Sequence, residues 1–256
     1  MAASARPFVL VPGACLGAWA WRDVAARLRE LGHEVHPVTL TGLGERVHLA
    51  NADIDLETHI EDLVNVIDFN AIEDAVLVGH SYAGVVVAGA ADRRPQRLDA
   101  VVYLDTSPLP SGTAIADTQS PEQRADQERV VRERGEGWKW PVPDREALES
   151  GVFGSAAGLD EEHLELISRL ATPQPYATLT SPLVLVDERP PHVRRAAIFC
   201  TAGEVNVAQL HELVARGDPR AAVFAGEDWE LHDLATGHWP MFSAPAALAE
   251  LLHEIA

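Results

Sequence analysis

The sequence predicts an α/β protein with a mostly parallel sheet flanked by helices. Short apolar runs alternate with segments of helical periodicity, turn signals separate them, and 47% of the 256 residues are hydrophobic. Strands that alternate with helices form parallel sheets with right-handed crossovers. A chain of this length can bury the core of one large domain or of two small ones.

The first half of the chain shows this alternation most clearly. The apolar run at 8–11 ends at Pro12-Gly13 and predicts a buried strand, and apolar residues at helical spacing follow over 19–31. The same patterns predict, in chain order, a strand at 33–40, a turn at 41–44, a helix at 56–69, a strand at 75–78, a helix at 81–92 and a strand at 100–104. In a parallel sheet, catalytic residues are expected on loops at the carboxyl ends of the strands.

The alternation breaks at Thr106, and the chain up to about Pro191 is rich in proline, glycine and charged residues. This segment contains helical patterns at 121–133, 144–149 and 159–170, and a strand pattern at 181–186. A disordered linker is the alternative interpretation, but the aromatic residues Trp138, Trp140 and Phe153 favour a folded segment.

The sheet pattern then resumes, with a strand at 196–200, a helix at 208–216, a strand at 230–234 and a helix at 245–255. No internal repeat or low-complexity tract interrupts this organisation. We therefore predict a core made of residues 1–105 and 192–256, into which residues 106–191 are inserted as a helical cap.

Composition argues against several classes of function. The 39 acidic and 20 basic residues give a net charge of −19, and such an acidic surface repels nucleic acid and anionic membranes. Cys15 and Cys200 are too few for a disulfide framework or a cysteine metal site, and no histidine pair has the pattern of a zinc helix. The chain shows neither a signal-peptide pattern nor a run of transmembrane length, so we expect a cytoplasmic protein without a metal.

A candidate nucleophile follows the strand at 75–78, in the sequence GHSYAG. A nucleophilic serine between strand and helix occupies so sharp a turn that the residues two before and two after it must be small. Gly79 and Ala83 meet this requirement, although glycine is usual where Ala83 stands. We predict that Ser81 is a nucleophile, and a turn serine without chemistry is the alternative.

A serine nucleophile needs a base, and the sequence offers 11 histidines. His238 lies after the last predicted strand and before the last helix, where the order serine, acid, histidine places the base. His80 is expected to point away from the site if Ser81 points into it. The glycine-containing loop after the first strand can aim the backbone N–H of Ala14 at the same point as the N–H of Tyr82, which would form an oxyanion hole.

Four segments together resemble the α/β-hydrolase superfamily, in particular the branch of plant methylesterases, hydroxynitrile lyases and small bacterial esterases. They are FVLVPGACLGAWAW, VLVGHSYAGVVVAGAAD, AVVYLDTSPLP and TGHWPMFSAPAALAELL, and the resemblance spans nearly the whole chain except the middle of the cap. It implies the α/β-hydrolase fold, a helical cap over the site and a serine-hydrolase triad. Relatives usually carry histidine where this chain has Pro12, which puts the shape of the oxyanion loop in question.

The resemblance also separates hydrolases from lyases. The cyanohydrin lyases of this branch carry threonine where this chain has Gly13, and lysine where it has Trp239. Without that positive charge nothing stabilises the departing cyanide, so the comparison disfavours a lyase.

The acid of the triad is open between two residues. Aligned on the strand at 196–200, the position that is aspartate in the plant enzymes is Gly203, and Glu204 follows it. The alternative is Asp105, at the carboxyl end of the strand beside the nucleophile's strand, where some α/β-hydrolases place their acid. We favour Asp105 as the residue that orients His238.

These residues predict a cofactor-independent serine hydrolase that cleaves a small-molecule carboxylic ester through an acyl-enzyme intermediate. A thioesterase, lactonase or amidase of secondary metabolism would use the same triad, and a catalytically silent protein that binds a small ligand is a third possibility. Gly13, Trp138, Trp140 and Trp239 are expected to bind the substrate, although packing of the cap explains each tryptophan equally well. We expect a monomer or homodimer whose partner is a small-molecule ester, without nucleic acid or membrane.

Overall fold

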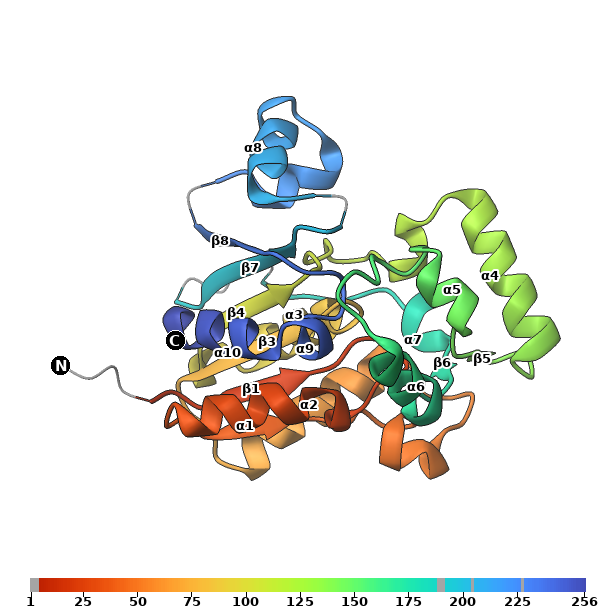
Figure 1. Cartoon of the computed structure of the whole chain (residues 1–256), viewed down its shortest axis with the longest axis horizontal. Coiled ribbons are helices and arrows are strands. Elements are labelled where there is room, and N and C mark those ends of the chain that lie inside the picture. Colours follow the sequence, from red (N-terminus) through yellow and green to blue (C-terminus); the bar gives the residue numbers. More distant parts are fainter. Residues whose placement is uncertain (1–4, 188–191, 204, 227) are drawn as a thin grey trace.

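The computed structural model describes residues 5–187, 192–203, 205–226 and 228–256. Its main element is a six-stranded sheet in the order β2-β1-β3-β4-β7-β8, in which every neighbouring pair is parallel (Figure 1). The strands are β1 (Phe8–Val11), β2 (Val35–Pro37), β3 (Ala75–His80), β4 (Leu98–Leu104), β7 (Arg194–Cys200) and β8 (Trp229–Leu234). The predicted α/β class with a parallel sheet is confirmed.

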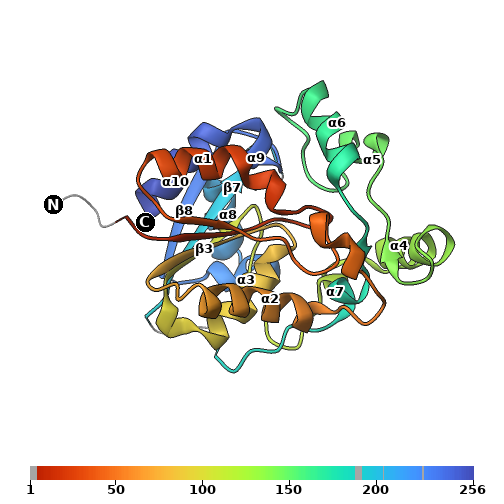
Figure 2. The ribbon, with the colours of Figure 1, turned by 90° about the horizontal axis from the view of Figure 1, so that it is seen from below.

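Helices cover both faces of this sheet (Figure 2). The helices of one face are α1 (Arg22–Glu30) and α10 (Pro245–Ile255), and those of the other are α2 (Leu56–Phe69) and α3 (Ala83–Arg93). Successive side chains of a strand point to opposite faces, so Leu10 joins the core beneath α1 and α10 while Val9 joins the core beneath α2 and α3. The central strands β1, β3 and β4 are therefore buried on both sides, whereas the edge strand β8 stays partly exposed. The ends of the buried strands remain available to form a site.

The chain between β4 and β7 leaves the sheet and forms a separate group of small elements beside it (Figure 1). These are η4 (Ile115–Thr118), α4 (Pro121–Arg134), β5 (Lys139–Trp140), α5 (Arg145–Glu149), α6 (Glu161–Leu170), β6 (Gln174–Pro175) and α7 (Ala177–Thr180). The three longer helices form where helical patterns were found, whereas the antiparallel pair of β5 and β6 was not predicted. The remaining elements are η1 (Ala18–Trp21), η2 (Gly44–Leu49), η3 (Pro95–Arg97), α8 (Val207–Ala215), η5 (Pro219–Phe224) and α9 (Pro240–Ser243).

The predicted strand at 181–186 is wrong. Leu183 is fully buried and exchanges two backbone hydrogen bonds with residues 112–113, whereas Val184 is 65% and Val186 is 97% exposed. β4 already pairs with β3 and β7 on its two edges, and β7 pairs with β4 and β8, which leaves no edge there for another strand. A short apolar run predicts that side chains are buried, but it does not show which strand the segment would pair with.

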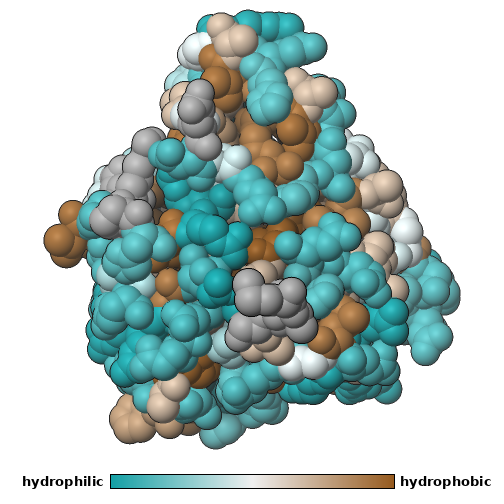
Figure 3. Space-filling model, turned by 90° about the vertical axis from the view of Figure 1, so that its left-hand side faces the viewer, coloured by the Kyte–Doolittle hydropathy of each residue, from teal (hydrophilic) through white to brown (hydrophobic). Residues whose placement is uncertain are grey.

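Figure 3 shows one face of the molecule, on which hydrophilic side chains predominate and apolar ones gather mainly near the top. Among the described helices, none combines the length and apolar character needed to cross a bilayer. The cytoplasmic location stays a prediction.

Candidate active site

Ser81 occupies the sharp turn between β3 and α3. Its φ is 51°, in the left-handed region that a residue with a side chain adopts at a cost of roughly 1–3 kcal/mol. A Cβ on Gly79 would lie 2.7 Å from Val87 Cγ2 and 2.8 Å from the carbonyl oxygen of Ala83, so only glycine fits there. Small flanking residues allow this sharp turn, and the turn holds the serine above the sheet.

Gly84, one place after the usual glycine position of this motif, is required by a different contact. A Cβ on Gly84 would lie 2.8 Å from Thr106 Cγ2, because α3 passes close to the loop that follows β4. Ala83 occupies the usual glycine position and is completely buried, so its methyl group is accommodated. The turn therefore requires glycine at position 79 but accommodates a small side chain at position 83.

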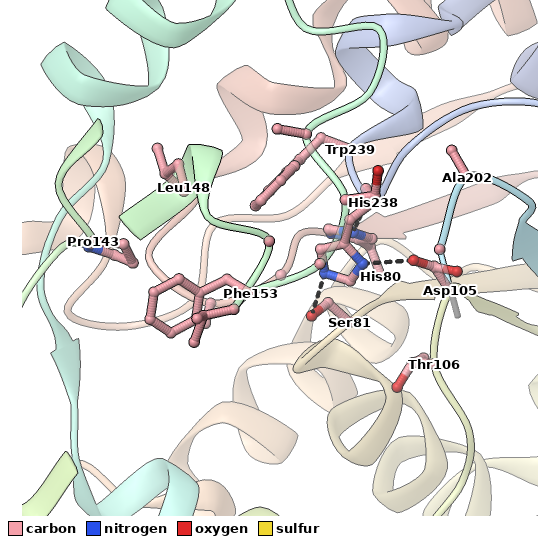
Figure 4. A pocket seen from close by; sticks show the side chains of 18 of the residues that line it. His80, Ser81, Asp105, Thr106, Pro143, Leu148, Phe153, Ala202, His238 and Trp239 are labelled. Carbon is pink, nitrogen blue, oxygen red and sulfur yellow. Dashed lines mark hydrogen bonds and ion pairs between the residues drawn. The ribbon is translucent and has the colours of Figure 1, made fainter. Parts of the chain in front are cut away.

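The imidazole of His238 connects Ser81 to Asp105 (Figure 4). His238 lies in the loop between β8 and α9, with Nε2 3.0 Å from Ser81 Oγ and Nδ1 2.6 Å from Asp105 Oδ2. A carboxylate only accepts, so Nδ1 carries the proton, and Nε2 is left to accept a hydrogen bond from the serine hydroxyl. This arrangement can remove the proton from Ser81.

Asp105 directly follows β4 and is held from a second side. Its φ is 49°, and its Oδ1 accepts the backbone N–H of Cys200 at 2.9 Å. Burial acts to raise the pKa of Asp105, but the hydrogen bond and charge of His238, with the N–H of Cys200, keep this pKa below its usual value. The carboxylate is therefore ionised beside His238. The other candidate acid, Glu204, lies outside the described residues.

The loop after β1 passes directly in front of the serine. A Cβ on Gly13 would lie 2.7 Å from His80 Nδ1 and 3.2 Å from Ser81 Cβ, so the close approach requires glycine and leaves no room for a threonine. The backbone N–H groups of Ala14 and Tyr82 have no backbone acceptor within the described part of the chain. Neither N–H group is therefore committed to a main-chain partner there.

The expectation that His80 points away from the site is wrong. His80 Nε2 donates to the backbone carbonyl of His238 at 2.7 Å, and the two rings lie 4.7 Å apart. Its Nδ1 is buried and has no partner in the described residues. His80 lies at the carboxyl end of β3, and the loop after β8 that carries His238 lies at the same edge of the sheet. His80 therefore supports the main chain of His238 instead.

A glycine-rich segment from the inserted region, residues 151–158, covers His238. The backbone N–H of His238 donates to the carbonyl oxygen of Ser155 at 2.7 Å, and that of Gly237 donates to Ala157 at 3.1 Å. Gly154 has φ of 108°, and a Cβ there would lie 2.5 Å from His238 Cβ. The repeated glycines of this segment, Gly151, Gly154 and Gly158, are the sequence signal for such a close approach.

Gly154→Ala is expected to lower kcat by about 10- to 100-fold, because the added methyl group pushes the segment off the imidazole. Gly151→Ala is the matched control, since Gly151 also has a positive φ, 79°, but a Cβ there would meet only one oxygen, 4.0 Å away. Steady-state kinetics of both variants measure the difference. Equal losses of kcat would show that backbone strain alone matters.

Two buried histidines predict that the protein is destabilised by acid. Burial lowers the pKa of His59 to about 4 and that of His80 to about 3, although hydrogen bonds to the carbonyls of Thr41 and His238 oppose this. The unfolded chain takes up these protons near pH 6.5, but the folded chain does not. The free energy of unfolding should therefore fall as the pH drops from 6.5 toward 4, by about 1.4 kcal/mol per pH unit for each histidine.

Urea denaturation across this pH range measures the effect. His59→Gln is expected to reduce the slope by the contribution of one histidine, since glutamine does not titrate. An unchanged slope would contradict the assignment. His59 matters to the site because its Nε2–H donates to Thr41, so its Nδ1 accepts the hydroxyl of Tyr82 at 2.8 Å.

A cavity of about 1170 Å³ opens beside Ser81. Its apolar lining includes Leu148 and Phe153 of the inserted segment and Trp239 of the core (Figure 4). Leu16, Trp140 and Ile167 also line it. Gly13, Trp140 and Trp239 of the predicted substrate-binding set line it. Trp138 is not among its described lining residues. Its ring lies under the ammonium group of Lys139, which is 4.6 Å from the ring centroid.

A parallel sheet with serine, aspartate and histidine on the loops after β3, β4 and β8 is the architecture of hydrolases with a nucleophile elbow. The chain belongs to the alpha/beta hydrolase family, whose profile matches residues 8–251. This result agrees with the predicted fold and with the family resemblance of the sequence.

Individual relatives cover the whole chain. It is 31% identical to the "Carbendazim hydrolyzing esterase" of Nocardioides sp. (strain SG-4G), over 96% of this chain and 97% of that protein. It is 28% identical to "Methyl jasmonate esterase 1" of Vitis vinifera, over 98% and 96% of the two chains. An extracellular alpha/beta-hydrolase from a Paenibacillus species has a similar fold, with a TM-score of 0.78 and 21% identity over 97% of this chain and 98% of that chain.

Proposed function

We propose that the protein is a serine esterase that hydrolyses a small-molecule carboxylic ester. The observation that carries the proposal is the continuous hydrogen-bonded series from Ser81 through His238 to Asp105, beside a cavity. Relatives that span nearly the full chain are named esterases, which supports the same reaction.

In this mechanism Ser81 Oγ attacks the ester carbonyl while His238 Nε2 takes its proton. Asp105 remains ionised and stabilises the imidazolium. The negative oxygen of the tetrahedral intermediate accepts hydrogen bonds from the N–H groups of Ala14 and Tyr82. His238 then returns the proton to the departing alcohol, and a water molecule activated by His238 releases the acid from Ser81.

The inserted segment, residues 106–191, acts in this proposal as a cap that provides one apolar wall of the cavity around the substrate, and the core provides the other. Trp140 and Trp239 contact the substrate, and Gly13 leaves space for its carbonyl group. Trp140 and Phe153 pack with ring centroids 5.2 Å apart, which gives the cavity a wide aromatic wall. This lining favours an ester with an uncharged apolar group.

Incubation with a fluorophosphonate probe tests the proposal, because such probes react with an activated serine. We expect labelling at Ser81, located by peptide mass spectrometry, and no labelling of Ser81→Ala. A protein that only binds a ligand would remain unlabelled. A panel of p-nitrophenyl esters, thioesters and amides then identifies the preferred bond, and an ester is expected to be cleaved fastest.

A further inference from the structure

The loop that carries Ala14 is only weakly stabilised by interactions within the loop. Its internal hydrogen bond, from the N–H of Leu16 to the carbonyl of Gly13, is long at 3.3 Å. Cys15 has φ of 67°, a conformation that is unfavourable for a residue with a side chain. Such a conformation persists only when surrounding groups impose it.

The surrounding groups come from the inserted segment, close to β6. The N–H of Thr172 donates to the carbonyl oxygen of Cys15 at 2.9 Å, and the N–H of Cys15 donates to Gln174 Oε1 at 3.0 Å. Both backbone groups of Cys15 are therefore bound by residues nearly 160 positions away. Together these two bonds fix the two peptide planes on either side of Cys15.

The carboxamide of Gln174 is itself held in one orientation. Gln174 is completely buried, and its Nε2 donates to Thr178 Oγ1 at 2.8 Å. The Thr178 hydroxyl donates in turn to the carbonyl of Pro175 at 2.6 Å, so Oγ1 acts as an acceptor toward Gln174. A reversed carboxamide would point its N–H groups at the N–H of Cys15. The acceptor oxygen therefore faces the loop.

We propose that Gln174 is a positioning residue that holds the Ala14 N–H where it binds the transition-state oxyanion. The inference rests on the proposed esterase function and extends it, because it makes the cap a part of the oxyanion hole. Without Gln174 the N–H of Cys15 is buried and unpaired, and the loop relaxes from its left-handed conformation. The Ala14 N–H then turns away from the point at which negative charge develops.

Gln174→Met tests this, since methionine has a similar length and no acceptor comparable to an amide oxygen. We expect kcat for a p-nitrophenyl ester to fall about 10- to 100-fold while KM changes less than about threefold. The inhibition constant of phenylboronic acid, which forms a tetrahedral adduct on the serine, should rise by a similar factor. Active-site titration corrects each value for the fraction of folded enzyme, so a merely structural role would not move them.

Two substitutions at Thr178 keep the test decisive if Gln174→Met does not fold. Thr178→Val removes the hydroxyl that orients the carboxamide and should reproduce the loss of kcat and of boronic acid affinity in weaker form. Thr178→Ser keeps the hydroxyl and should resemble the wild-type enzyme. Unchanged kcat and boronic acid affinity in Thr178→Val, or equal losses in both Thr178 variants, would overturn the proposal. Failure of the esterase function is distinguishable, because the wild-type Ser81 would then not react with a fluorophosphonate.

Discussion

Ser81→Ala is expected to lower kcat for ester hydrolysis by about 10⁴- to 10⁶-fold. The hydroxyl is the group that attacks the carbonyl, and it lies 3.0 Å from the nitrogen that takes its proton. Alanine leaves the oxyanion donors and the cavity in place, so KM should change little. Steady-state kinetics with a p-nitrophenyl ester measure the loss, and thermal unfolding checks that the variant remains folded.

Ser150→Ala is a suitable control because Ser150 is exposed at the end of α5, where its hydroxyl donates to the carbonyl of Ala147 and accepts a long hydrogen bond from the N–H of Val152 at 3.3 Å. Its kcat should equal that of the wild-type protein. Substantial residual hydrolysis by Ser81→Ala, at a tenth of the wild-type rate or more, would mean that another group is the nucleophile.

Asp105→Asn is expected to lower kcat by about 10⁴-fold, and the structure explains why so small a change has this effect. Asp105 Oδ1 accepts the N–H of Cys200, so the oxygen of asparagine would take that place. Its amide nitrogen would then face His238 Nδ1 and donate to it. The proton of the imidazole would move to Nε2, which could no longer accept the proton of Ser81.

Glu204→Gln is the comparison variant, since Glu204 is the other acid that the sequence offers. We expect it to keep kcat within about threefold of the wild-type value. Parallel kinetics of the two variants at one pH decide between the two acids. A large loss in Glu204→Gln with little change in Asp105→Asn would reverse the assignment.

The framework of the protein was readable from local patterns. The apolar run at 75–78 and the helical stripe at 56–69 predict which side chains of one element are buried. This pattern depends only on the residues of that element. α2 therefore spans the predicted residues 56–69, and β3 extends the predicted strand by two residues. Ser81 and His238 could be singled out because small residues and strand ends surround them in the sequence itself.

The partners of these residues could be decided only by the tertiary structure. The sequence left Asp105 and Glu204 open, and the fold brings the Asp105 carboxylate to 2.6 Å from a histidine 133 positions away. The contact of His80 with His238 and that of Gln174 with Cys15 were likewise absent from any local pattern. Local periodicity determines which residues are buried. The path of the chain through the inserted segment determines which buried polar groups meet. The reason is that hydrogen bonds depend on position in space rather than on distance along the sequence.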